Sequence, residues 1–332
     1  MRKIALLAFG VAVAASASGL TARSYVQKGL KASYDGIDNA GTGTHDPAVR
    51  TWKDLTGNGY DGTLADIVAW DGGNCWTTTV SGRPVKLPLT LSSVTATRTF
   101  TVDCAFSPSR AVKDNAARET VFGQYTGNNN GTFNIEHNHG SHPAGCLRIY
   151  LNKGEIDAYS SGCVLADQNA TVALAVTPAR QVLYIDGVSD IVSAKSLTRL
   201  DSSKDSYIGG EPNREDMGFR GTYYGCRVYD RALTAEEVAV NNAVDAIRYR
   251  GASASDFTLS GGYSFDAEGE LLVDLTATAG AGGQVRAGDG AFAASAVVPV
   301  NQDGTASATF TAAPDAGYEF VAWSLEDVTA RK

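Results

Sequence analysis

The feature that most constrains this chain is a succession of short strand-like runs separated by turn clusters, from about residue 25 to residue 249. Runs such as 100–106, 171–176 and 181–185 are rich in β-branched and aromatic residues, and polar and apolar positions alternate along them. The turns between the runs draw on 36 glycines, against only 9 prolines in the whole chain. This pattern is typical of antiparallel strands joined by tight turns, and it predicts an all-β fold.

One short helix is expected directly after the last strand-like run. Thr234-Ala235-Glu236-Glu237 matches a capping box, in which the first and last side chains each bond the other's backbone amide. Gly251 is suited to end the helix. Between these residues an apolar stripe recurs at helical spacing: Val240, Val244 and Ile247. A single helix after the last strand is typical of a sandwich sealed at one edge or end.

The first seventeen residues have the composition of a secretory signal peptide. Arg2 and Lys3 precede an apolar run from Ile4 to Ala15, and Ala15-Ser16-Ala17 supplies a small-residue cleavage site. The run is too short to cross a bilayer, and no later stretch reaches the roughly 18 apolar residues of a transmembrane helix. We therefore expect export to the extracellular space, the cell surface or the periplasm.

Composition excludes several classes of protein. The formal net charge of −8 argues against nucleic acid or an anionic membrane surface as the main partner. With 14 Tyr, 11 Phe and 4 Trp, the chain carries too many aromatic residues for intrinsic disorder. Charge and composition do not specify the ligand or the oligomeric state.

Export makes disulfide bonds possible for the five cysteines. Cys146 and Cys163 flank a strand–turn–strand pattern centred on residues 152–154, and a hairpin there places the two sulfurs opposite one another, so this pair is the disulfide candidate. Cys104 and Cys226 lie inside apolar runs and are expected to be buried thiols. No C-x-x-C motif is present, so a zinc ribbon or thioredoxin-like site is not expected.

Four segments carry a more specific pattern: residues 25–39, W-K-D-L-T-G-N-G-Y-D-G-T-L at 52–64, L-Y-I-D-G-V at 183–188, and F-R-G-T-Y-Y-G-C-R-V-Y-D-R-A-L at 219–233. In this order they resemble bacterial laminin-G-like, concanavalin A-like modules. The resemblance implies a two-sheet antiparallel jelly-roll sandwich with one short C-terminal helix. The chain departs from the family mainly at Cys226, where an aliphatic residue is usual.

A second, smaller β domain is expected after the jelly roll. Its segment 316–323, A-G-Y-E-F-V-A-W, resembles the end of internalin-type B repeats, which are small β modules of bacterial surface proteins. Aromatic side chains supply the most buried area per residue, so we expect Tyr318, Phe320 and Trp323 to fill the core of this domain. The predicted organisation is a signal peptide (1–17), a jelly roll (24–251), a linker (252–255) and a small β repeat-like domain (256–326).

The segment G-E-I-D-A-Y-S at 154–160 is the strongest catalytic candidate. It resembles the G-E-I-D-x-x-E motif of laminarinase-type glycoside hydrolases, in which the first Glu is the nucleophile and the last is the acid/base. A retaining mechanism needs both carboxyl groups. Here Ser160 replaces the second, and a hydroxyl cannot protonate a leaving group at neutral pH. No G-x-S-x-G elbow is present either, so no catalytic residue is predicted.

Two regions are candidates for ligand binding. His137 and His139 would share a face if they lie on one strand, with His142 closing from the next turn, which suits a transition-metal site beside Glu136 or a sugar-facing loop. A solvated polar loop is the alternative. Trp70 and Trp76 flank a turn, where an exposed ring could stack on a sugar. The binding candidates are therefore Trp70, Trp76, Tyr125, Asn128, Asn130, His137 and His139.

Calcium is the one cofactor predicted. Asp35, Asp38 and Asn39 place hard oxygen ligands in a glycine-bearing turn, and laminin-G-like modules often hold calcium. The spacing is not that of an EF-hand. Ordinary turn chemistry also accounts for these residues without a metal.

Three functions remain open at this point. The first is a secreted, non-catalytic binding or adhesion protein that recognises glycan or another cell-surface ligand. The second is a structural spacer of a surface assembly with no small ligand, and the third is a degenerate glycoside hydrolase. Exposed aromatic rings around Trp70, Trp76 and Tyr125 would favour the first function, and their burial would favour the second.

Overall fold

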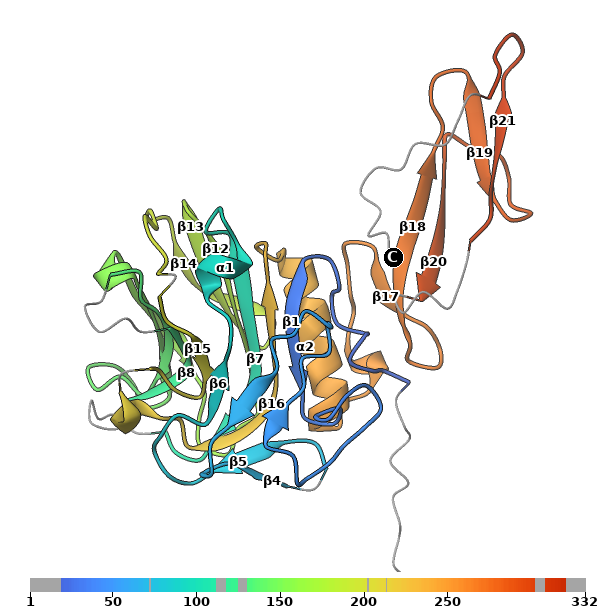
Figure 1. Cartoon of the computed structure of the whole chain (residues 1–332). Helices are drawn as coiled ribbons and strands as arrows, with labels where there is room; N and C mark the ends of the chain where they lie inside the picture. Colours follow the sequence, from blue (N-terminus) through green and yellow to red (C-terminus); the bar gives the residue numbers. More distant parts are fainter. Residues whose placement is uncertain are drawn as a thin grey trace, which may run out of the picture.

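The computed structural model describes residues 19–71, 73–111, 118–124, 130–201, 203–212, 214–301 and 308–320. Two antiparallel sheets of eight strands each pack face to face (Figure 1), which confirms the predicted jelly-roll sandwich. The first sheet has the order β14 (Val188–Ser193), β13 (Arg180–Ile185), β12 (Ala170–Thr177), β7 (Phe100–Pro108), β16 (Gly221–Tyr229), β5 (Trp76–Thr78) and β4 (Ala69–Trp70), with β1 (Leu30–Asp35) also paired to β16.

The second sheet carries the surface described in the next section. Its order is β11 (Ile156–Cys163), β10 (Cys146–Leu151), β9 (Phe133–His137), β8 (Glu119–Gln124), β15 (Ser206–Ile208), β6 (Val85–Leu87), β3 (Gly62–Leu64) and β2 (Thr51–Trp52). Short helical segments join the strands: α1 (Leu91–Val94), η2 (Asn152–Gly154), η3 (Glu215–Met217) and η4 (Ala254–Asp256).

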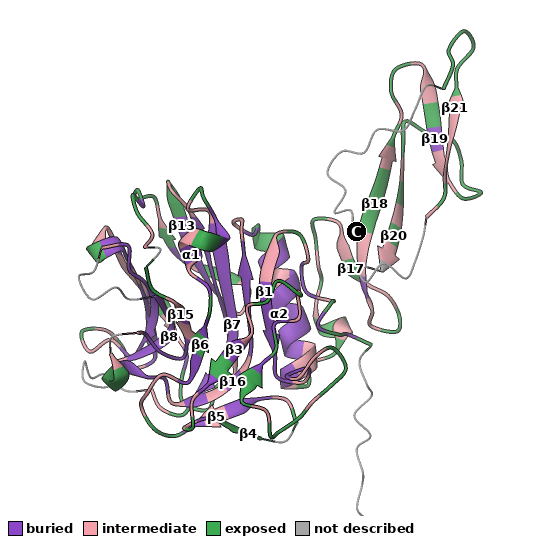
Figure 2. Cartoon of the chain, in the orientation of Figure 1, coloured by how far each residue is buried: buried purple, intermediate pink, exposed green. Residues whose placement is uncertain are grey.

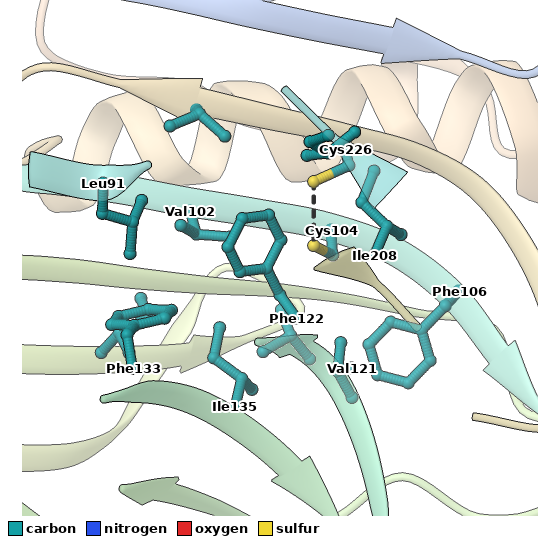
Figure 3. Close-up of a cluster of buried hydrophobic side chains, with 14 of the residues drawn as sticks. Leu91, Val102, Cys104, Phe106, Val121, Phe122, Phe133, Ile135, Ile208 and Cys226 are labelled. Atoms are coloured by element: carbon teal, nitrogen blue, oxygen red, sulfur yellow. Dashed lines mark hydrogen bonds between the residues drawn. The ribbon is translucent and has the colours of Figure 1, made fainter. Parts of the chain in front are cut away.

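The core lies between the two sheets and is built from alternate residues of each strand. Val102, Cys104 and Phe106 of β7 point inward, toward Phe122 of β8 and Phe133 of β9 (Figure 3). Every residue of β7 is buried, because one of its faces meets the core and the other meets a helix. Figure 2 shows this burial running through the centre of the sandwich.

That helix is α2 (Ala235–Arg250), and it begins and ends as the sequence predicts. Thr234 and Glu237 form the capping box, and Gly251 adopts the left-handed conformation at φ 70°. The helix covers the outer face of the first sheet through a buried ion network. The Arg227 guanidinium bonds Asp245 of the helix at 2.6 and 2.9 Å and Asp103 of β7 at 3.0 Å. Among the described residues, α2 covers the outer face of the first sheet and does not cover that of the second.

Two predicted hairpins are present. The turn between β13 and β14 places Asp186 at φ 49° and Gly187 at φ 80°, the two left-handed residues of the expected Asp-Gly turn. Strands β10 and β11 pair so that Cys146 and Cys163 are direct Cα partners. All five cysteines are nevertheless thiols in the structure, so the hairpin is confirmed and the disulfide stays a prediction.

The C-terminal region forms two narrow sheets, one of β17 (Tyr263–Phe265), β18 (Leu271–Thr278) and β20 (Ser295–Asn301), the other of β19 (Gly283–Ala287) and β21 (Phe310–Pro314). Leu271 packs in the cluster that includes α2, and the strands then run away from the sandwich (Figure 1). Tyr318 and Phe320 were predicted to fill the core of this region. This prediction is wrong, because their side chains are 61% and 49% exposed. Sheets of two or three strands enclose too little volume to bury them.

Two of these predictions, the signal peptide at 1–17 and the core position of Trp323, fall outside the described residues. No helix in the described ranges is long and apolar enough to span a membrane.

Candidate ligand-binding face

The outer face of the second sheet gathers polar and aromatic side chains. Strands β9, β10 and β11 turn their apolar residues to the core, so the residues between them point outward. Cross-strand pairing aligns the outward residues in two rows: Thr120, Glu136, Arg148 and Tyr159 in one, and Gly123, Asn134, Tyr150 and Asp157 in the other. We call the surface made by these two rows the polar face.

Arg148 lies at the centre of the polar face and is held from two sides. Its guanidinium bonds both carboxylate oxygens of Asp157 at 2.8 Å, and Nη1 bonds Glu136 Oε2 at 3.0 Å. The guanidinium carbon lies 4.4 Å from the centre of the Tyr150 ring. These bonds occupy three of the five N–H donors of the arginine. The hydrogen bonds from Arg148 hold the pKa of Asp157 below its usual range, so this carboxylate stays charged at neutral pH.

An aromatic group borders Arg148 on one side. The His142 ring stacks on Tyr159 with centroids 3.6 Å apart and planes 7° apart, and His139 meets the same tyrosine edge-on at 4.9 Å. All three rings are half-buried, so each keeps part of its surface accessible. Burial and then the charge of Arg148 lower the pKa of His139, which keeps its imidazole neutral near pH 7.

Glu211, which follows β15, adds a buried carboxyl group to the polar face. Its side chain is 1% exposed, and Asn134 Nδ2 donates to its Oε2 at 2.7 Å. The same amide donates to Glu136 Oε1 at 3.3 Å, so Asn134 joins the two carboxyl groups. Burial raises the pKa of Glu211 to about 7; the bond from Asn134 lowers it and the charge of Glu136 raises it further. Glu211 therefore changes charge near neutral pH.

Several buried polar atoms on this face have no hydrogen-bond partner among the described residues: Asn134 Oδ1, Thr120 Oγ1, Arg118 Nε and His142 Nδ1. Buried polar groups in native proteins are normally satisfied by protein, water or ligand. The set includes acceptors and donors. All four atoms are buried, so a ligand would reach them only after a neighbouring side chain moves.

A pocket of about 260 Å³ lies at the rim of the polar face, where β11 meets β14, and Asp157, Val192 and Lys195 are among its lining residues. This is below the roughly 300–1,000 Å³ of typical small-molecule sites. Recognition here would therefore use the surface of the sheet more than an enclosed cavity.

The structure does not place the predicted tryptophans on the polar face. Trp70 and Trp76 are Cα partners in the β4–β5 hairpin and therefore share one side of it, which is turned inward. Trp76 is fully buried and stacks on Tyr223 at 4.8 Å. Trp70 is half-buried, and its indole N–H donates to the Val49 carbonyl at 3.1 Å. The predicted stacking role is wrong for Trp76, because its ring is enclosed in the core.

His137 and His139 do not lie on the same face of the sheet. His137 faces the core, where Nε2 lies 2.8 Å from the Val164 carbonyl oxygen, so it does not reach a ligand. Strand β9 ends at His137, and Asn138 at φ 65° then turns the chain. His139 consequently lies on the opposite side from His137, and the prediction that the two point the same way is wrong. No group of three or more metal-ligating side chains occurs within the described ranges.

Three binding candidates remain: Asn130, Tyr125 and Asn128. Asn130 is half-buried in the turn before β9. Tyr125 and Asn128 lie outside the described residues.

The predicted calcium ligands are engaged by protein groups. Both carboxylate oxygens of Asp35 accept from Arg248 Nη2 at 2.9 Å, and Asp38 Oδ2 lies 3.6 Å from the same nitrogen. Asn39 bonds the backbone of Asp46 through both atoms of its amide, at 2.8 and 2.9 Å. The Arg248 guanidinium thus pairs with Asp35 and lies beside Asp38. Calcium at these residues stays a prediction, and an ion there would have to compete with Arg248.

The predicted catalytic segment divides between two environments. Glu155 directly follows η2. Its carboxylate accepts a hydrogen bond from the backbone N–H of Thr198 at 2.9 Å and so holds the loop that contains Thr198. Ser160 is buried and accepts from the Leu147 amide at 2.8 Å. Asp157 and Tyr159 of this segment belong to the polar face.

Sequence reasoning missed most residues of the polar face, namely Arg148, Tyr150, Tyr159, Asn134 and Glu211. One signal was present: the outward residues alternate with apolar ones at 133–137, 147–151 and 156–160. Glu211 carries no such signal, because it reaches this face only through the pairing of β15 with β8.

Comparison with known proteins supports the fold. Residues 81–239 match the family model described as the concanavalin A-like lectin/glucanases superfamily, and this match covers a little less than half of the chain. No curated protein matches the sequence. The chain is similar to the Trypanosoma rangeli sialidase in complex with 2,3-difluorosialic acid, with 14% identity and a TM-score of 0.50 over 64% of this chain and 33% of that one. The match spans a third of the sialidase and shows the fold alone.

Two smaller structures are also similar. Domain 4 of AbnA, a GH43 extracellular arabinanase from Geobacillus stearothermophilus in complex with arabinotriose, shares 18% identity over 64% of this chain and 98% of that chain, with a TM-score of 0.46. The Ruminococcus gnavus IT-sialidase CBM40 bound to α2,3-sialyllactose shares 17% identity over 51% and 96%, with a TM-score of 0.39. These likenesses are too distant to indicate a ligand for this chain.

Proposed function

We propose that this protein is exported and binds carbohydrate on the polar face without catalysing a reaction. The observation that carries the proposal is the arrangement around Arg148: a guanidinium fixed by Asp157 and Glu136, beside the stacked rings of Tyr159 and His142. Charged groups in fixed positions form strong hydrogen bonds with hydroxyl groups, and an aromatic ring presents an apolar surface next to them. A sugar ring needs both kinds of contact.

The rigidity of this arrangement favours binding. Asp157 holds Arg148 through two parallel hydrogen bonds, and Tyr150 covers its guanidinium. A ligand therefore meets groups that are already ordered, which lowers the entropy lost on association.

The absence of catalysis is part of the proposal. A glycosidase needs two carboxyl groups with different protonation states beside the scissile bond. Asp157 and Glu136 both bond Arg148. Glu211 has a raised pKa, but its side chain is 1% exposed and bonded to Asn134, so it is shielded from a substrate. An assay on β-glucans with Glu155→Gln and Glu211→Gln tests this: activity lost in either variant would establish a hydrolase instead.

Glycan arrays and polysaccharide pull-downs test the binding proposal. Tyr159→Ala removes the ring under His142, and we expect at least a tenfold loss of affinity. Tyr318→Ala is the matched control, because Tyr318 is 61% exposed in the C-terminal region, away from the polar face. Both variants are checked for an unchanged thermal midpoint. No binding beyond a denatured control, or equal loss in both variants, would contradict the proposal.

A second variant tests Arg148 directly. Arg148→Lys keeps the charge but cannot form the two parallel bonds to Asp157. We expect weaker binding, while the matched change at an exposed arginine of the first sheet, Arg180→Lys, leaves binding unchanged.

A structural spacer without a small ligand is the second candidate function. The burial of Trp76 and the strands β18 to β21 running away from the sandwich favour it (Figure 1). Likeness of the C-terminal region to an internalin-type B repeat would fit a surface protein, and this likeness remains a prediction. Failure of every glycan in the binding experiment would favour the spacer.

A further inference from the structure

Cys104 of β7 and Cys226 of β16 lie next to one another in the core. They are direct Cα partners in the antiparallel register, and their Sγ atoms are 3.2 Å apart (Figure 3). Both side chains are fully buried between the two sheets. Although 122 positions separate them along the chain, the fold brings their sulfurs into contact.

The backbone at this position already suits a disulfide bond. Bonded cysteines have Cα atoms about 4.4–6.8 Å apart. Residues directly opposite in an antiparallel pair are separated by about 4.5 or 5.5 Å, depending on their place in the ladder, and both values fall in that range. The sulfurs must close from 3.2 Å to a bond of about 2.05 Å, which side-chain rotation achieves without moving the strands.

A second cysteine pair has a matching register. Cys146 and Cys163 are Cα partners at the open end of the β10–β11 hairpin. The fifth cysteine, Cys75, instead donates from Sγ to Asp71 Oδ2 at 2.9 Å, just before β5. Four of five cysteines thus stand in two opposed pairs, and an oxidising compartment would allow both pairs to form disulfides.

We propose that Cys104 and Cys226 form a buried disulfide in the mature protein, with Cys146–Cys163 as the second bond and Cys75 as the single thiol. The inference rests on the exported location proposed above. Two thiols lose two protons and two electrons and form one S–S bond. A disulfide of a thiol–disulfide catalyst or of oxidised glutathione is the acceptor: its own S–S bond breaks and it leaves as two thiols.

The burial of Cys104 and Cys226 determines the stage of folding at which their disulfide bond can form. Desolvation raises the pKa of the Cys104 thiol well above its usual value, so almost no reactive thiolate exists once the sheets have closed. Oxidation therefore takes place while the chain is folding, after β7 and β16 pair and before the core is sealed. The finished bond joins two central strands of the first sheet and is inaccessible to reductants in the folded state.

Peptide mapping tests the pairing directly. The full chain is refolded with reduced and oxidised glutathione, denatured, alkylated without reduction and digested with trypsin. The Lys and Arg positions put each cysteine on its own peptide: 54–86 for Cys75, 99–110 for Cys104, 119–148 for Cys146, 154–180 for Cys163 and 221–227 for Cys226. We expect peptides 99–110 and 221–227 to be cross-linked and to separate on reduction, with peptide 54–86 alkylated. Alkylated Cys104 and Cys226, or either one linked to another cysteine, would overturn the inference.

Unfolding with and without reductant gives an independent test. Reduction should lower the denaturant midpoint of the wild type, and by a smaller amount in the double variant Cys104→Ala/Cys226→Ala. Cys75→Ala is the matched control and should respond as the wild type does. Equal sensitivity of the double variant and the wild type would refute the bond. Because refolding in glutathione needs no export, failure of secretion would count against the proposed function alone.

Discussion

The charge of Glu211 should make the stability of this protein depend on pH near neutrality. The carboxyl group is buried on the polar face, and its pKa in the fold is about 7 against a usual value of 4.5. A raised pKa means that the fold favours the protonated form. Its contribution is fully present below about pH 4.5 and is lost as the pH rises through 7. The difference of 2.5 pKa units corresponds to about 3 kcal/mol of unfolding free energy.

Replacing Glu211 by Gln isolates this contribution. The amide keeps an oxygen that accepts from Asn134 but never becomes charged. Denaturant unfolding at pH 4 and pH 8 should therefore show Glu211→Gln gaining about 3 kcal/mol relative to the wild type between the two pH values. The other titrating groups are the same in both proteins, so their contributions to the pH dependence of the unfolding free energy cancel.

The matched control is Glu215→Gln. Its side chain is 69% exposed and pairs with Arg83 at the surface, so this change should alter the free energy of unfolding by less than about 1 kcal/mol. A wild type and a Glu211→Gln variant whose stabilities run parallel from pH 4 to pH 8 would refute the argument that burial holds this carboxyl neutral.

Three further predictions concern groups outside the polar face. Asp245→Ala leaves the buried guanidinium of Arg227 with one carboxylate fewer, and unfolding titrations should show a loss of about 3–5 kcal/mol, against less than about 1 kcal/mol for Asp230→Ala at the surface. Trp76→Ala should cost about 3–5 kcal/mol without weakening glycan binding by the protein that remains folded, because its ring is in the core; a selective loss of binding would restore it as a ligand residue. Arg248→Gln removes the cation that pairs with Asp35 and lies beside Asp38, so added calcium should raise the thermal midpoint more in this variant than in the wild type. An equal or smaller rise would contradict calcium binding at these residues.

Local rules were enough for the parts of the fold that neighbouring residues determine. The Asp186-Gly187 turn, the Thr234 capping box and the Gly251 helix end depend on contacts within a few residues, and the structure has all three. The strand alternation identified the sandwich for the same reason, since one face of each strand must be apolar.

Predictions about sites were less successful, because a motif does not say which way its residues point. His137 and His139 have strand spacing, but the strand ends between them and the two rings lie on opposite sides. Trp70 and Trp76 flank a turn, but pairing in the β4–β5 hairpin turns both inward.

The sequence by itself determined a β sandwich, the position of helix α2 and the turns that join its strands, because short-range sterics and alternation specify them. Only the tertiary structure decided that Arg148, Tyr159 and Glu211 share one face and that Cys104 meets Cys226. These contacts depend on the pairing register between strands that are distant in sequence. That register is set by the packing of the whole core, so no local segment determines it.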